Sequence, residues 1–94
     1  MEKYKYEVRK YLITENIKPR YVGFAYLEKA ILLSIRNPSL STQKLFATSS
    51  GIPWESAYHA AQYALKKSKG NLSVTDFIHM AANSLEIGGN TDGV

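Results

Sequence analysis

Residues 41–61 read STQKLFATSSGIPWESAYHAA, and their spacing predicts two short helices joined by a tight turn. Ser41 is a typical N-cap, because its side-chain oxygen can accept hydrogen bonds from the free backbone N–H groups of the first turn. Gly51 allows the chain to reverse, and Pro53 opens the second helix, where its missing N–H is harmless. Small residues such as Ala57 let the two helices pack closely, as in a helix-turn-helix.

The outer face of the second helix carries the side chains that would read DNA in the major groove. The candidates for contact with base edges are Glu55, Ser56, His59 and Gln62. Glu55 can accept a hydrogen bond from cytosine N4, and Gln62 can pair with N6 and N7 of adenine. The candidates for contact with phosphate are polar or cationic and flank this face: Thr42, Gln43, Lys44, Ser50, Lys66, Lys67 and Lys69. The same residues also fit an ordinary solvated helix face, so their chemistry alone leaves both interpretations open.

The charge balance favours a polyanionic partner. The chain of 94 residues has 12 Lys and Arg against 8 Asp and Glu, a formal net charge of +4. Clustered cations displace counterions from DNA phosphates, which favours a nucleic-acid partner. A basic balance also serves solubility, so it does not decide the function by itself.

Apolar residues recur at helical spacing along the rest of the chain, which predicts an all-α, five-helix bundle. The expected helices span residues 3–16, 20–36, 41–49, 53–68 and 74–86. They form a single helix-turn-helix domain over residues 1–87, and residues 88–94 are expected to be a disordered tail. The second helix is apolar nearly all round and should be the central buried one. Gly23 lowers its helix propensity by about 1 kcal/mol relative to alanine, so we expect another backbone to cross closely at this glycine.

The composition argues against several classes of protein. The chain has no cysteine, and its two histidines lie far apart in sequence, so we expect no metal site. No apolar run approaches the ~20 residues of a membrane helix, and the first residues lack a secretory signal, so we expect a cytoplasmic chain without membrane association. We also expect no catalytic residue, cofactor or small-molecule substrate, because no carboxylate is spaced to work with either histidine and His79 should be an exposed helix position.

Four segments carry a resemblance to a known family. Residues 23–31, GFAYLEKAI, are similar to the Gly-Tyr-x-Tyr-Leu-x-x-Ala-Ile signature of the C-terminal effector domain of the sporulation master response regulator, stage zero sporulation protein A. The similarity resumes in the same order at residues 44–46, 54–57 and 76–82. The resemblance covers about residues 17–86 with gaps. It implies an all-α transcription-factor domain that binds DNA through a helix-turn-helix.

The chain departs from that family where DNA is read. Family members carry arginines on the recognition helix, at positions that match Pro53, Ser56 and His59 here, whereas Glu55 is retained. The connections on either side of the helix pair are shorter than in the family. The family's receiver domain has no counterpart in this sequence, and the helix expected over residues 3–16 stands in its place.

Two functions follow from these observations. The first is a small transcriptional regulator of the sporulation-regulator effector-domain type, whose helix over residues 53–68 enters the major groove of double-stranded DNA, with a dimer reading two half-sites. The alternative is a degenerate helix-turn-helix fold that acts as a protein–protein interaction or dimerisation module, forming a homodimer or a heteromer that modulates a full-length regulator. The tyrosines at positions 4, 6, 11, 58 and 63 favour the alternative, since aromatic residues are enriched at interfaces. Tyrosines at helical spacing are, however, more often core residues.

Overall fold

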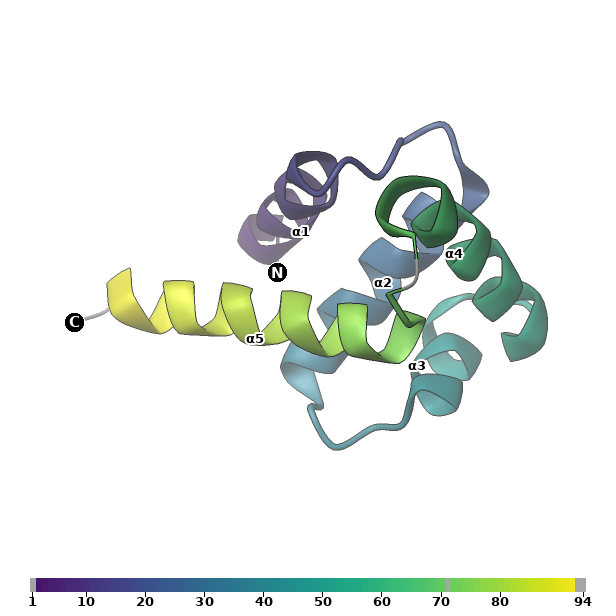
Figure 1. Ribbon diagram of the computed structural model, residues 1–94. Coiled ribbons are helices and arrows are strands. Elements are labelled where there is room, and N and C mark those ends of the chain that lie inside the picture. Colours follow the sequence, from purple (N-terminus) through teal and green to yellow (C-terminus); the bar gives the residue numbers. More distant parts are fainter. Residues whose placement is uncertain (1, 71, 93–94) are drawn as a thin grey trace.

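The computed structural model describes the backbone of residues 2–70 and 72–92 and the side chains of residues 4–68, 70 and 72–85. Within these residues the chain forms five α-helices and no strand, which confirms the predicted all-α bundle (Figure 1). The helices are α1 (Glu2–Thr14), α2 (Val22–Arg36), α3 (Thr42–Ser49), α4 (Trp54–Lys69) and α5 (Val74–Asp92).

Helix α2 is the centre of the bundle, as its composition predicts. It packs against each of the other four helices. Its largest buried side chains, Phe24, Leu27 and Ile31, recur at helical spacing and join a continuous core with Leu12 of α1 and Phe77 of α5. A helix that is enclosed on several sides in this way has little surface left to face solvent, which explains its nearly uniform apolar composition.

Helices α2 and α4 cross at Gly23 with almost no space between their backbones. A Cβ atom placed on Gly23 would lie 2.7 Å from the carbonyl carbon of Ala60 and 2.9 Å from Cα of Ala61, and closer still to the carbonyl oxygen of Ala60. This confirms the close backbone approach expected at Gly23. The crossing holds α4 against the bundle, with Ala57 and Ala64 buried on the same inward face.

Helix α1 ends two residues before the predicted position, in a cap made by Asn16. Asn16 adopts a left-handed conformation with φ of 72°. Its N–H donates to the carbonyl of Ile13, and the N–H of Ile17 donates to the carbonyl of Leu12, both at 2.9 Å. This is the hydrogen-bond pattern of a Schellman motif, in which asparagine can replace the usual glycine. Ile17 and Leu12 are both buried, so their burial fixes the direction in which the chain leaves α1.

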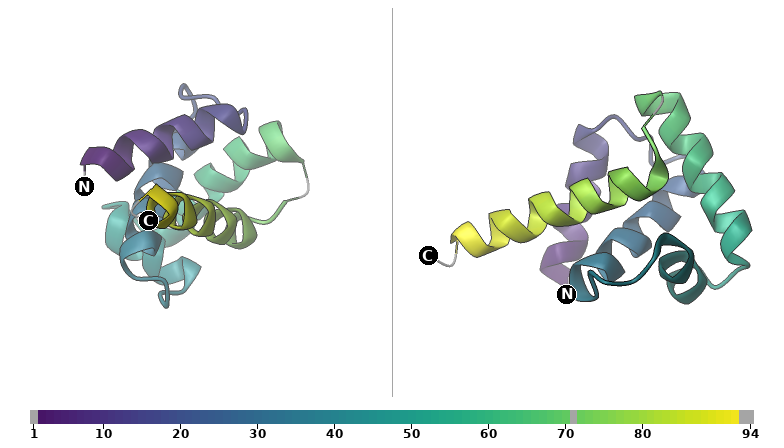
Figure 2. Two further views of the ribbon diagram at one scale, coloured as in Figure 1. Left: turned by 90° about the vertical axis from the view of Figure 1, so that its left-hand side faces the viewer. Right: turned by 60° about the horizontal axis from the view of Figure 1, so that its bottom comes forward.

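Helix α5 is longer than predicted. The expected end at residue 86 is wrong, since the helix continues to Asp92, and residues 88–92 of the expected disordered tail are helical. Residues 93–94 of that tail lie outside the described residues. Gly88 and Gly89 each lower helix propensity by about 1 kcal/mol, but they keep their backbone N–H groups and do not end the hydrogen-bond ladder as proline would. The last turns of α5 project beyond the other helices (Figures 1 and 2).

An ion pair between Arg9 and Glu28 connects α1 to α2. The guanidinium Nε of Arg9 lies 3.1 Å from Oε2 of Glu28, without hydrogen-bond geometry. The Glu28 side chain is only 6% exposed, whereas that of Arg9 is 58% exposed. Arg9 therefore supplies a solvent-facing countercharge to a carboxylate that is buried in the bundle.

We expect Arg9→Met to lower the free energy of unfolding by about 1–3 kcal/mol, because it leaves a buried carboxylate without its cation. Urea denaturation measures this change. Lys10→Met is the matched control, since Lys10 is an exposed neighbour on the same helix and should change stability by less than about 0.5 kcal/mol. Equal losses in the two variants would show that the ion pair contributes nothing.

Candidate nucleic-acid interface

Local hydrogen bonds stabilise the start of α3 and the turn between α3 and α4. The N–H of Lys44 donates to the side-chain oxygen of Ser41 at 3.3 Å, so Ser41 caps α3 as predicted. In the turn, Ser50 Oγ donates to the carbonyl of Ile52 at 3.0 Å and accepts from its N–H at 3.3 Å. Gly51 has φ of 78°, a left-handed conformation that an L side chain rarely adopts. The turn glycine is therefore required by its backbone conformation, since nothing lies within 4 Å of the place where a Cβ would be.

Aromatic and small side chains pack on the inward side of α4. The ring of Tyr58 meets those of Phe46 and Trp54 edge to face, with centroids 6.1 and 6.2 Å apart. Ala57 and Ala61 are fully buried on the inward side of α4. The contacts tie both α3 and the first turn of α4 to one core, so the outer face of α4 is held at a defined orientation.

The four candidates for base contact lie together on the outer face of α4. Glu55, Ser56, His59 and Gln62 are all exposed. Glu55, His59 and Gln62 are separated by four and three residues, so they form one row along the helix, and Ser56 lies beside it. Beyond Gln62, a hollow of about 290 Å³ separates this face from the link that leads to α5. The structure thus brings together the polar row that the helical period predicts.

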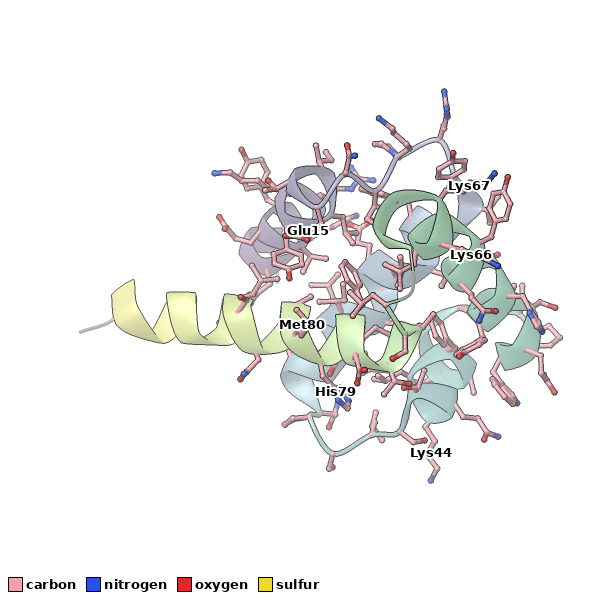
Figure 3. The ribbon with its side chains drawn as sticks, in the orientation of Figure 1. Glu15, Lys44, Lys66, Lys67, His79 and Met80 are labelled. Carbon is pink, nitrogen blue, oxygen red and sulfur yellow. The ribbon has the colours of Figure 1, made fainter. Side chains whose placement is uncertain are left out.

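The cationic candidates for phosphate contact lie on two different helices. Lys44 extends from α3, whereas Lys66 and Lys67 lie near the end of α4, far from Lys44 in the same view (Figure 3). All three side chains are exposed, as is that of Gln43. The side chain of Lys69 lies outside the described residues. The exposed cations therefore come from two different helices, and Lys66 follows Gln62 along the same face of α4.

Both hydroxyl candidates for phosphate contact, Thr42 and Ser50, already form hydrogen bonds inside the protein. The hydroxyls of Thr42 and Thr75 are 2.7 Å apart and share a hydrogen bond that connects the starts of α3 and α5. Ser50 is bonded to Ile52 in the turn and is only partly exposed. Thr42 therefore connects α3 to α5 and Ser50 stabilises the turn, roles that sequence reasoning did not assign to them.

The structure also places beside α4 two residues that the sequence did not single out, Arg20 and Tyr21. The guanidinium carbon of Arg20 lies 5.6 Å from the ring centroid of Tyr21, in the loop after α1. Tyr21 meets Tyr63 of α4 edge to face at 5.7 Å, and Nζ of Lys67 lies 5.5 Å from the Tyr63 centroid. The loop before α2 is therefore part of the surface around α4.

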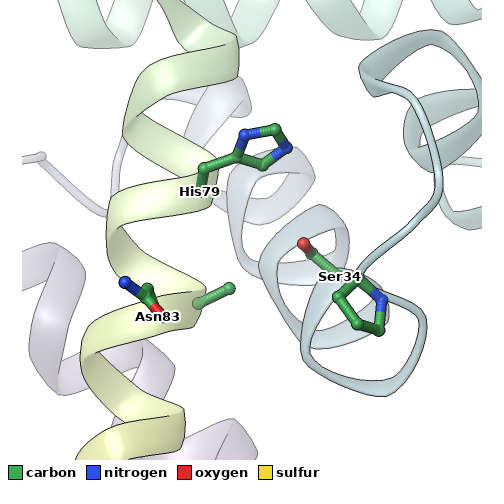
Figure 4. A pocket seen from close by; sticks show the side chains of 5 residues that line it. Ser34, His79 and Asn83 are labelled. Atoms are coloured by element: carbon green, nitrogen blue, oxygen red, sulfur yellow. The ribbon is translucent and has the colours of Figure 1, made fainter.

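A second hollow, of about 230 Å³, lies between α2 and α5 and is bordered by Ser34, His79 and Asn83 (Figure 4). His79 is exposed, as predicted for its helix position.

Among the side chains that the structure describes, no group of three His, Asp or Glu residues is close enough to hold a metal ion. In the same part of the chain, every helix is too short or too polar to cross a membrane.

No known protein family, curated protein or solved structure matches this chain.

Proposed function

We propose that this chain is a small DNA-binding regulator of transcription that inserts α4 into the major groove. The observation that carries the proposal is the exposed row of Glu55, His59 and Gln62, with Ser56 beside it, on the second helix of a helix-turn-helix pair. A helix with its side chains is about 10–12 Å across, which fits a major groove about 12 Å wide. The resemblance to the effector domain of the sporulation regulator supports the same role.

The arrangement of charge supports this docking. Lys44 lies on α3, whereas Lys66 and Lys67 lie near the end of α4 and far from Lys44, so cations are available for phosphates at separate points around α4. Phosphate contacts set the register of a protein on DNA, while contacts to base edges supply specificity. The row holds no arginine, so we propose that specificity depends on Glu55 with cytosine and Gln62 with adenine.

The proposal predicts salt-sensitive binding to double-stranded DNA. Four candidate lysines, at positions 44, 66, 67 and 69, give a slope of log Kobs against log salt at least as steep as about −3.6. Affinity should then fall at least roughly 150-fold between about 50 and 200 mM salt. Fluorescence anisotropy with a labelled random duplex measures this slope.

Selection from a random duplex library then identifies the preferred sequence. If the protein binds the selected sequence more tightly than the random duplex, this preference supports the proposal that α4 contacts base edges. Absence of binding to any duplex at the lowest salt contradicts the proposed function.

The alternative is a protein–protein interaction module, and the outer face of α1 favours it. Tyr6 and Ile13 are 66% and 56% exposed. Together with Arg9, Lys10 and Thr14 they border a hollow of about 330 Å³. Of the other tyrosines, Tyr11 packs against Phe77 and Tyr58 packs against Phe46, so these two side chains pack against the hydrophobic core. Light scattering across a concentration series tests the alternative, and a strictly monomeric protein that co-purifies with no partner contradicts it.

A further inference from the structure

Two segments that are distant in the sequence meet in a chain of cations and rings. Arg20 lies against Tyr21 in the loop between α1 and α2, and Lys67 lies against Tyr63 near the end of α4. The two rings pack edge to face at 5.7 Å, which connects the loop to the helix. Cation–π contacts restrict the two long side chains, so they are held on this surface instead of being free to sample solvent.

The same two segments contain cations and no acids. Residues 16–27 contain Lys18 and Arg20, residues 56–75 contain three lysines, and neither segment contains Asp or Glu. Lys18, Arg20 and Lys67 are exposed, and Tyr63 is 55% exposed. A DNA backbone holds condensed cations, and a cluster of positive side chains that replaces them gains the entropy of their release.

The position of this surface along α4 matches the border of a major groove. Lys67 lies eleven residues after Ser56, a distance of about 16 Å along the helix axis. The groove is only about 12 Å wide, so a helix whose first turns lie in the groove carries Lys67 out to the bordering backbone. Tyr63 and Lys67 are also seven and eleven residues after Ser56, so the three share one face of the helix and the surface continues directly from the polar row.

We infer that Lys18, Arg20, Tyr21, Tyr63 and Lys67 form a basic–aromatic surface that binds the phosphate backbone of duplex DNA beside the groove that α4 enters. This inference rests on the proposed function. Arg20 supplies paired N–H donors for a phosphate, Lys18 and Lys67 supply point charges, and the two phenol hydroxyls are further donors. The loop before α2 thereby becomes a second element of DNA contact, outside the helix-turn-helix.

The test compares two double variants that remove the same charge. Lys18→Gln with Arg20→Gln should make the salt slope shallower by about 1.8, so that the loss of affinity between about 50 and 200 mM salt becomes about tenfold smaller than in the unchanged protein. Lys5→Gln with Lys10→Gln is the control, because both lysines are exposed on α1 and should leave the slope unchanged. All four side chains are exposed, and thermal melting of each variant verifies that the fold is kept.

The outcomes separate the inference from the proposed function. If the unchanged protein binds no duplex, the proposed function fails. If it binds and the Lys18 and Arg20 variant keeps the full slope, only the inference fails. An equal loss in the Lys5 and Lys10 control would also overturn the inference, because net charge alone would explain it. Vesicles containing phosphatidylserine give a third measurement: binding to vesicles that Lys18 and Arg20 control, with an unchanged duplex slope, would assign the surface to lipid headgroups instead.

Discussion

Gly23→Ala should lower the free energy of unfolding by about 3 kcal/mol, although helix propensity alone predicts a gain of about 1 kcal/mol. The added methyl group would meet the carbonyl group of Ala60 and Cα of Ala61, which are backbone atoms and cannot turn aside as a side chain can. The two helices would have to separate, and the buried contacts of Ala57 and Ala64 along the same face of α4 would loosen with them. The sign of the change therefore distinguishes backbone crossing from helix propensity.

Urea denaturation measures this change, and Ala25→Gly provides the matched control. Ala25 is exposed on the same helix, so its replacement by glycine reports helix propensity alone and should cost about 1 kcal/mol. A stabilised Gly23→Ala protein would contradict the close crossing of α2 and α4. A destabilised one that keeps its helical circular dichroism should also bind DNA less tightly, because Ala60 and the candidate face belong to the same helix.

The features that the sequence predicts well are those set by local periodicity. The inward and outward faces of α4 follow from the 3.6-residue period, which puts Ala57 and Ala61 inside and His59 and Gln62 outside. Gly23 also predicts a structural feature from local sequence. A glycine lowers the stability of an apolar helix, so its presence indicates that the missing side chain makes room for another backbone. Both inferences depend only on residues within one or two helical turns of each other in the sequence.

The features that the sequence does not predict depend on residues that meet only after folding. The hydroxyl of Thr42 is bonded to that of Thr75, 33 residues away, which no local pattern indicates. The edge-to-face contact of Tyr21 with Tyr63 has the same origin, so the contribution of the α1–α2 loop to the surface around α4 was missed. The end of α1 is a milder case: the cap at Asn16 is a known local motif, but Pro19 gives the more obvious signal three residues later along the loop.

Glu55→Ala should change DNA binding in opposite directions on two kinds of duplex. On a duplex obtained by selection, the variant loses an acceptor for cytosine N4 and should bind about 5- to 150-fold less tightly, the equivalent of 1–3 kcal/mol. On a random duplex it loses a negative charge beside the phosphates and should bind slightly more tightly. Glu55 is exposed in the first turn of α4, which is the part of the helix that the proposed docking places in the groove.

Asp76→Ala is the control for this pair of measurements. Asp76 is also an exposed acid in the first turn of a helix, α5. Its removal therefore changes the net charge, and removes a favourable interaction with the helix dipole, in the same way as removal of Glu55. It should leave the ratio of affinities for selected and random duplexes unchanged. If Glu55→Ala instead tightens binding to both duplexes equally, Glu55 only repels phosphate and α4 does not read cytosine at that position. Specificity would then have to come from Gln62, His59 or the shape of the DNA, since the row contains no arginine to contact guanine.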